Sequence, residues 1–195
     1  MATTVSIANA AATRIGSTAR IVSLDDDRTV ARTIKSMWDI SRRAVLRDGS
    51  WNFAARRAEL AAEVNSERVI YPWAYAFPLP ASSLRLIEVL DLPSRVDYQL
   101  EDGAVLCNSA GPLRVRYAID VPELARWDEL AAEAFALRLA WRCGHKIAGS
   151  AFDKDACWRD YREALGRARN VDAIENPPIP FEDGSWIEAR QGGAW

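Results

Sequence analysis

The stretch "LRVRYAIDVPELARWDELAAEAF", residues 113–135, decides the fold because one periodicity gives way to another within it. From Leu113 to Ile119 every second residue is large and apolar, which is the pattern of a β-strand with one buried face. Pro122 then suits the first turn of a helix, and apolar residues recur at helical spacing to about Ile147. A strand that leads directly into a long helix predicts an α+β fold.

The region before this stretch, residues 51–120, predicts short antiparallel strands. "YPWAYAFPLP", residues 71–80, is an extended segment, and "VDYQLEDGAVLC", residues 96–107, places a Glu-Asp-Gly turn between two apolar runs, as in a β-hairpin. We interpret the aromatic side of the extended segment as a sheet face that packs on the core, with a stacking platform for nucleic-acid bases as the alternative. Its residues are Tyr71, Trp73, Tyr75 and Phe77.

Helices are predicted on both sides of the β region, over residues 4–16, 26–47, 122–147 and 152–172. Ser23 and Asp26 resemble a capping box at the start of the second helix. That helix also has a basic stripe opposite its apolar face. A stripe of this kind is most often a solvated face, and a channel or interface surface is the functional alternative. The stripe consists of Arg28, Arg32, Lys35 and Arg42.

The order of these elements predicts three regions. Residues 1–50 and 121–175 form one discontinuous antiparallel helical bundle, and residues 51–120 are inserted in it as an antiparallel β subdomain. Residues 176–195, "NPPIPFEDGSWIEARQGGAW", have no helical or strand period, and their prolines favour an extended start. This arm has more large apolar residues than a solvated linker would, so we expect it to bind another chain. Its candidate contact residues are Phe181, Trp186, Ile187, Arg190 and Trp195.

The composition restricts the function. Hydrophobic residues make up 49% and charged residues 27% of the chain, as in an ordinary globular protein. The formal net charge of −2 disfavours tight binding of DNA, which requires a basic surface. The three cysteines are odd in number and widely spaced, which favours a reducing compartment such as the cytoplasm. No apolar run is long enough to predict a membrane span, and the N-terminus does not resemble a secretory signal.

The residue pattern predicts no catalytic group, metal site or cofactor. His145 is the single histidine, and its place near a predicted helix end favours a capping role. A zinc site with Cys143 and Cys157 is disfavoured, because residues two apart on a helix point in different directions. The acidic run at residues 25–27 is explained better by helix capping than by a metal-dependent nuclease site.

Several stretches, taken in order, resemble one family. "SLDDDRTVARTIKSMWDISRRAVLRDGSWNFAARRAEL", residues 23–60, resembles the opening of tail tubular protein A of short-tailed phages and its head–tail adaptor relatives. The segments "YPWAYAFPLPASSLRLIEV", "GPLRVRYAIDV", "YREALGRARNVDAIENPP" and "SWIEAR" continue the resemblance in the same order, over about residues 15–190. Residues 61–70 keep little of the pattern. The first segment is matched at Trp51, Asn52, Phe53, Ala54, Arg57, Ala58, Glu59 and Leu60.

The resemblance implies a non-enzymatic virion protein that is assembled in the host cytoplasm. Members of the family form a homo-oligomeric ring, usually a dodecamer, between the portal protein and the tail nozzle, which is built of a tail tubular protein B-like subunit. Double-stranded DNA passes loosely through the ring. A ring subunit needs apolar surface on two flanks, and the broad apolar face of helix 122–147 suggests Trp127, Phe135 and Trp141 for this role. The alternatives are a neck or completion protein of a long-tailed phage, or an enzyme that acts on DNA or the cell wall.

Overall fold

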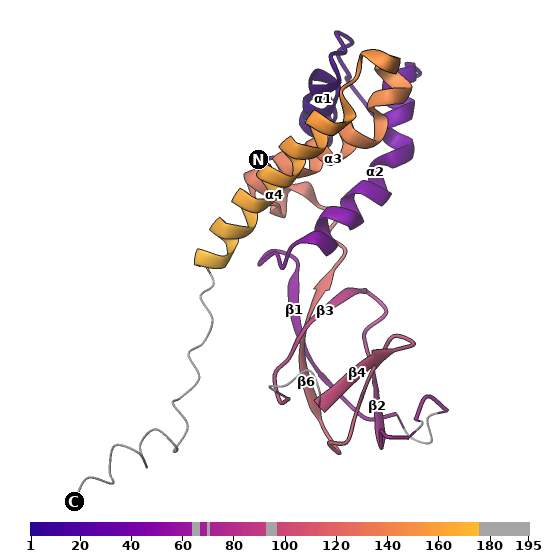
Figure 1. Ribbon diagram of the computed structural model, residues 1–195, viewed down its shortest axis with the longest axis vertical. Coiled ribbons are helices and arrows are strands. Elements are labelled where there is room, and N and C mark those ends of the chain that lie inside the picture. Colours follow the sequence, from indigo (N-terminus) through magenta and orange to yellow (C-terminus); the bar gives the residue numbers. More distant parts are fainter. Residues whose placement is uncertain (64–66, 70, 93–96, 176–195) are drawn as a thin grey trace, which may run out of the picture.

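The computed structural model describes residues 1–63, 67–69, 71–92 and 97–175. It confirms an α+β fold with antiparallel sheets. Figure 1 shows the helices gathered at one end of an elongated molecule and the strands at the other. The predicted arm, residues 176–195, lies outside the described residues, and so do its candidate contacts Phe181, Trp186, Ile187, Arg190 and Trp195.

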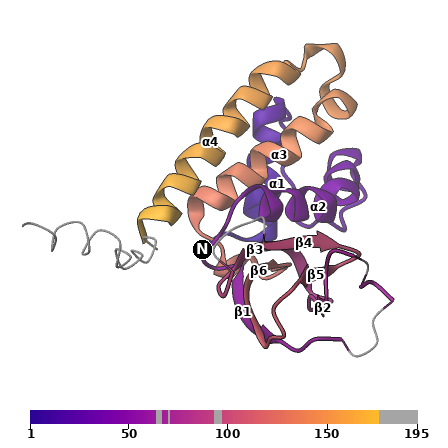
Figure 2. The ribbon, with the colours of Figure 1, turned by 60° about the horizontal axis from the view of Figure 1, so that its bottom comes forward.

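The described chain has four α-helices, and three of them pack around α3, which lies in the centre of the helical part (Figures 1 and 2). Their bounds are α1 Thr4–Ile15, α2 Thr29–Asp48, α3 Glu129–Ala148 and α4 Lys154–Glu175, with short 3-10 turns η2 Leu124–Arg126 and η3 Gly149–Ala151. Helix α3 contacts α1, α2 and α4. This position explains the broad apolar face that the sequence shows, because three helices of the same chain cover it.

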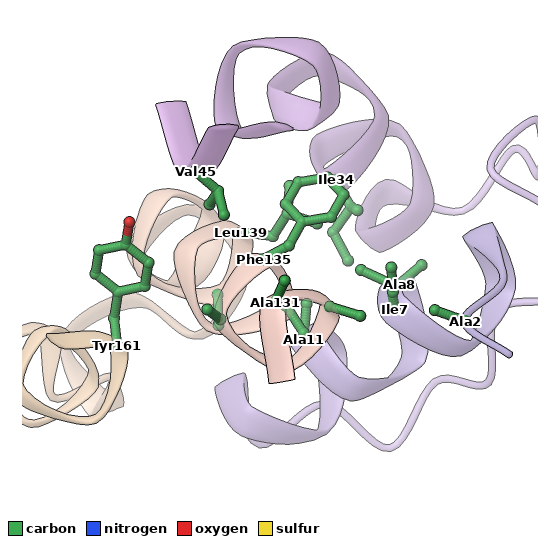
Figure 3. Close-up of a cluster of buried hydrophobic side chains, with 14 of the residues drawn as sticks. Ala2, Ile7, Ala8, Ala11, Ile34, Val45, Ala131, Phe135, Leu139 and Tyr161 are labelled. Carbon is green, nitrogen blue, oxygen red and sulfur yellow. The ribbon is translucent and has the colours of Figure 1, made fainter. Parts of the chain in front are cut away.

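The core of the helical part is closed by side chains from each helix. Ile34 of α2 meets Phe135 and Leu139 of α3, and Tyr161 reaches from α4 toward α2 (Figure 3). Small residues, among them Ala8 of α1, let the helices approach closely. The same cluster includes residues at the border of the β part, so the core extends to the junction between the two parts.

The strands form two antiparallel three-stranded sheets, in the orders β1-β6-β3 and β2-β5-β4. Their bounds are β1 Ala55–Leu60, β2 Tyr75–Pro78, β3 Ser83–Val89, β4 Tyr98–Glu101, β5 Ala104–Cys107 and β6 Leu113–Ile119. A second buried cluster lies between the sheets and joins Phe77 of β2 and Val105 of β5 to Val115 of β6. The alternation predicted over residues 113–119 is confirmed from Leu113 to Tyr117, where Leu113, Val115 and Tyr117 are buried. It ends there, because Ala118 is also buried and Ile119 is only partly buried.

The predicted Glu-Asp-Gly hairpin is confirmed. Glu101 pairs with Ala104, and Asp102 and Gly103 form the two-residue turn. Both turn residues have positive φ, 45° and 71°, which Asp-Gly adopts readily. The aromatic face over residues 71–77 is confirmed only in part. Phe77 is buried, but Tyr71 precedes β2 and is 94% exposed.

Two helix starts differ from the prediction. Helix α2 begins at Thr29, and the Ser23 hydroxyl accepts a hydrogen bond from the Asp25 amide in the preceding turn, so the predicted capping box is wrong. Helix α3 begins at Glu129 rather than near Pro122, because the Asp128 carboxylate caps the amides of the first turn. Residues 124–126 form a separate 3-10 turn before it.

None of the helices in the described chain has the length and apolar character to cross a membrane.

Candidate functional site: a groove between helices and sheets

The chain crosses between the helical part and the β part twice, and a tryptophan fixes each crossing. Trp51 follows α2, and its indole N–H donates to the Val45 carbonyl at 2.8 Å. Trp127 precedes α3, and its indole N–H donates to the Val121 carbonyl at 3.0 Å. Phe53 lies between the two, with ring centroids 5.9 Å from Trp51 and 5.2 Å from Trp127. Both tryptophans are buried, so the junction between the two parts is packed like a core.

A groove opens on the surface of this junction, beside the last turns of α4. The Asn52 amide N–H donates to the Asp172 carboxylate at 2.9 Å, and the Asn52 side-chain amide donates to the Asp172 carbonyl at 2.9 Å. These bonds hold the end of α4 beside the segment that leads into β1. We call the hollow on either side of Asn52 the junction groove. Its lining is Ser50, Trp51, Asn52, Ala55, Arg56, Arg57, Arg116, Gly166, Arg169, Asn170, Asp172, Ala173 and Glu175.

The junction groove consists of two adjoining hollows of about 450 and 530 Å³, both lined by Asn52 and Arg116. Four arginines but only two carboxylates, Asp172 and Glu175, belong to the lining, so the groove has an excess of two positive charges. The arginines are Arg56, Arg57, Arg116 and Arg169. Within the described residues, none of these four forms an ion pair.

Arg85 of β3 adds to this positive field. Its guanidinium donates to the Gly49 carbonyl at 2.9 Å and to the Ser50 hydroxyl at 2.8 Å. Its Nε atom is buried and has no hydrogen-bond partner in the described part of the chain. Burial, together with the charges of Arg169 and Arg47, lowers the pKa of Arg85. The charge of Asp48 opposes this shift. A partly desolvated charge beside others of the same sign is a frequent feature of binding sites.

One of the two carboxylates in the groove, Asp172, has a perturbed pKa. Burial raises the pKa of Asp172, and the charges of Glu175 and Asp128 act in the same direction. The hydrogen bond from the Asn52 amide and the charge of Arg116 oppose this shift. The arrangement can bind an anion by charge and hydrogen bonding. It contains neither a histidine nor a cysteine as a nucleophile or general base.

The basic stripe predicted on α2 does not form one open surface. Three of its residues form salt bridges with the acidic run at residues 25–27. The nitrogen–oxygen distances are 3.7 Å for Arg28–Asp26, 3.5 Å for Arg32–Asp27 and 2.6 Å for Lys35–Asp25. The fourth, Arg42, was predicted on the outer face, and this is wrong. It is 8% exposed and pairs with Asp120 of the β6–η2 connection and with Asp39. The acidic run thus balances the stripe, which the sequence pattern alone did not show.

Two of the three predicted interface residues of helix 122–147 are corrected by their burial. Trp127 is 5% exposed and Phe135 is 0% exposed, and both belong to the core of this chain. Trp141 is half-buried and packs on Trp158 of α4, with ring centroids 4.8 Å apart. The prediction assigned the broad apolar face of this helix to contact with another subunit, whereas α1, α2 and α4 of the same chain cover that face.

An aromatic cluster that the sequence analysis did not identify holds Arg138. Its guanidinium carbon lies 5.0–5.3 Å from the ring centroids of Trp141, Trp158 and Tyr161, within the range of cation–π attraction. The Tyr161 hydroxyl donates to the Asp48 carboxylate at 2.6 Å, and burial raises the pKa of Tyr161. The signal was available in the sequence, since Arg138, Trp141, Trp158 and Tyr161 follow helical spacings of three within α3 and within α4. The cluster joins α2, α3 and α4.

The other residues considered for chemistry are apart from the groove. His145 Nδ1 lies 3.1 Å from the Gly149 carbonyl at the end of α3, consistent with the predicted capping role. Cys143 is buried, and burial raises its pKa to about 11, so the thiol is not activated. In the residues that the structure describes, no group of three His, Cys, Asp or Glu side chains is arranged to hold a metal ion.

Comparison with known proteins gives no relative: no protein-family profile matches the chain, and no curated protein matches it either.

Proposed function

We propose that this protein is a structural component of a phage virion, a head-to-tail adaptor. In this proposal its copies form a ring, a dodecamer by resemblance, between the portal and the tail nozzle, and double-stranded DNA passes through the ring without tight binding. The helical bundle is the body of the subunit, the β insertion is a second subdomain, and residues 176–195 extend onto another chain. The proposed location is the head–tail junction of the virion, with assembly in the host cytoplasm.

One observation supports this proposal most directly. The segment that resembles the adaptor family, "WNFAARRAEL" at residues 51–60, builds the junction between the two parts of the molecule. Trp51, Phe53 and Ala54 pack in the junction core, whereas Asn52 and Arg57 line the groove beside it. A motif that both stabilises the fold and forms a polar surface groove is compatible with a binding role.

The charge of the molecule supports a conduit for DNA rather than a DNA-gripping protein. The net charge is −2, and the basic residues of α2 lie beside acids. A surface without a basic excess releases few counterions from DNA, so DNA can move past it. The arginines of the junction groove are confined to one place, and the remainder of the chain has a net negative charge.

Native mass spectrometry of the purified protein, alone and mixed with the portal protein encoded in the same genome, tests this proposal. We expect a monomer or weak oligomer alone and a closed ring of many copies on the portal. Electron microscopy of the mixture gives the copy number. A stable closed dimer that ignores the portal contradicts the proposal. Binding to the end of an already completed long tail favours the neck or completion protein instead.

A further inference from the structure

The junction groove has the properties of a binding site whose ligand is not among the described residues. Its arginines lack carboxylate partners there, and Arg85 at its edge has a buried Nε atom without a hydrogen bond. Positive charges that lie close together on a folded surface repel one another, which is unfavourable. A bound anion attracts all of them and so offsets this repulsion. The groove is therefore best occupied by an anion.

The lining favours a short acidic peptide over nucleic acid. Asp172 and Glu175 border the groove and would repel a long polyanion, whereas a peptide can place its few carboxylates away from them. Trp51, Ala55 and Ala173 give the groove an apolar component, which suits a peptide that combines carboxylates with aromatic side chains.

This chain contains such a peptide. Residues 181–188, "FEDGSWIE", include three carboxylates, two aromatic rings and no basic residue. They begin six positions after Glu175, the last residue of α4, which itself lines the groove. The seven residues from Glu175 to Glu182 could span at most roughly 25 Å, a reach that allows the acidic pair at 182–183 to meet a groove on another chain. In a ring of the proposed kind, the nearest groove on another chain belongs to a neighbouring copy.

We infer that residues 181–188 of one copy bind in the junction groove of the next copy, with Glu182 and Asp183 paired to the arginines that line it. The inference rests on the proposed function, which brings copies of the chain side by side. It assigns the groove as the receptor for the arm and explains why its arginines have no carboxylate partner in the described chain. Each subunit then contributes an arm to one neighbour and a groove to the other, a head-to-tail contact of the kind that closes rings.

The test uses a fluorescein-labelled peptide of residues 176–195 and the full-length chain, with binding measured by fluorescence anisotropy. The chain has Glu182→Lys, Asp183→Lys and Glu188→Lys, so that its own arm does not compete. We expect saturable binding that weakens at least ten-fold between 50 and 500 mM salt. The groove variant Arg57→Glu with Arg169→Glu changes two exposed residues and should weaken binding at least ten-fold. The control variant Arg159→Glu with Arg162→Glu changes two exposed arginines of α4 outside the groove and should bind as before.

A charge exchange makes the assignment specific. A peptide with Glu182→Lys and Asp183→Lys should not bind the original groove and should regain affinity for the groove variant, which for this measurement keeps the native acidic arm so that its own arm does not compete. If the peptide does not bind, or binds equally to both grooves, the inference is wrong. A 20-base-pair duplex that binds the original groove and not the groove variant, while the peptide fails, identifies a nucleic-acid site instead. Circular dichroism spectra of all variants verify that they are folded.

Photo-crosslinking decides between a neighbouring copy and the same chain. Full-length chains carrying a photo-reactive phenylalanine in place of Trp186 are labelled with nitrogen-15 and mixed with unlabelled chains on the portal. The expected crosslinks join a labelled arm to an unlabelled peptide from residues 50–57 or 166–175. If every crosslink joins two labelled peptides, the arm contacts its own chain and the inference is wrong. The peptide assay does not require ring formation, so it tests the inference separately from the proposed function. If the peptide binds but no rings form on the portal, only the proposed function is contradicted. If the groove variant still forms rings, only the inference is contradicted.

Discussion

Asp120 connects the helical and β parts of the molecule. It follows β6, and its carboxylate accepts hydrogen bonds from Arg42 at 2.8 and 2.9 Å and from Arg43 at 3.0 Å. Replacing Asp120 by Asn leaves the buried Arg42 with Asp39 as its remaining acidic partner. We expect a loss of about 2–3 kcal/mol in the free energy of unfolding, measured by urea denaturation. The control Asp25→Asn breaks an exposed pair with Lys35 and should cost less than about 1 kcal/mol. Equal losses would show that Asp120 is no more than a surface partner.

The same carboxylate predicts a pH dependence. Burial on its own would raise the pKa of Asp120, but hydrogen bonds and charge from Arg42 and Arg43 outweigh it, and the pKa is lowered. A lowered pKa in the folded state means that the stabilisation is present above the ordinary Asp pKa of about 3.9 and is lost as pH falls through the folded value. The difference in unfolding free energy between the native chain and Asp120→Asn should therefore shrink from pH 7 to pH 3. A difference that stays constant would contradict an ionic contribution.

Gly49 illustrates a constraint set by a neighbouring ring. A methyl group on Gly49 would overlap the ring of Trp51, which is 1% exposed and has little room to move. We expect Gly49→Ala to cost about 1–3 kcal/mol, as overpacking does. Gly166→Ala is the matched control, since nothing lies within 4 Å of the added group in the middle of α4. It should stabilise the helix by up to about 1 kcal/mol, and thermal unfolding of both variants tests the contrast.

At the level of helices, a side-chain cap marks the start of α3, whereas α2 begins after Arg28 without a side-chain cap hydrogen bond. The Asp128 carboxylate accepts from the amides of Leu130 and Ala131, at 2.9 and 3.3 Å. Asp128→Ala should therefore cost about 1 kcal/mol in unfolding free energy. Ser23→Ala should cost less than about 0.5 kcal/mol, because Ser23 lies in the turn before α2 and caps no helix. Chemical denaturation measures both losses. A larger loss of unfolding free energy for Ser23→Ala would indicate that Ser23 does cap α2.

The sequence predicted the existence of most elements and missed details that depend on tertiary contact. The hairpin at residues 98–107 follows from Asp102-Gly103, because the turn conformation belongs to that dipeptide. The inward position of Arg42 does not follow from helical periodicity, because its partner Asp120 is 78 residues away. The breadth of the apolar face of α3 was also recognised, but periodicity does not reveal whether the same chain or another covers it.

For the whole molecule, the candidate site was the part least accessible to prediction. Asn52 and Arg57 drew attention only through a family resemblance, and Arg116 appeared as the polar side of an alternating strand. The groove exists because α4 returns to the start of β1, a contact between residues 120 positions apart. No local pattern specifies such a return. Once the contact between α4 and the segment before β1 is known, the sequence does show that charged residues line the groove.

The last prediction concerns the chain cut after Glu175. Within the described residues, the three buried clusters are built from residues between Ala2 and Ala168, and we therefore expect the cores to form without residues 176–195. We expect the shortened chain to keep the circular dichroism spectrum of the full chain and its unfolding free energy to within about 1 kcal/mol. It should fail to assemble on the portal, because the proposed arm that joins neighbouring copies is gone. Mass spectrometry with the portal tests assembly, and the chain with Arg159→Glu and Arg162→Glu serves as the assembling control. If the cut unfolds the isolated chain, residues 176–195 stabilise their own subunit, and both the arm and its proposed groove in a neighbour must be abandoned.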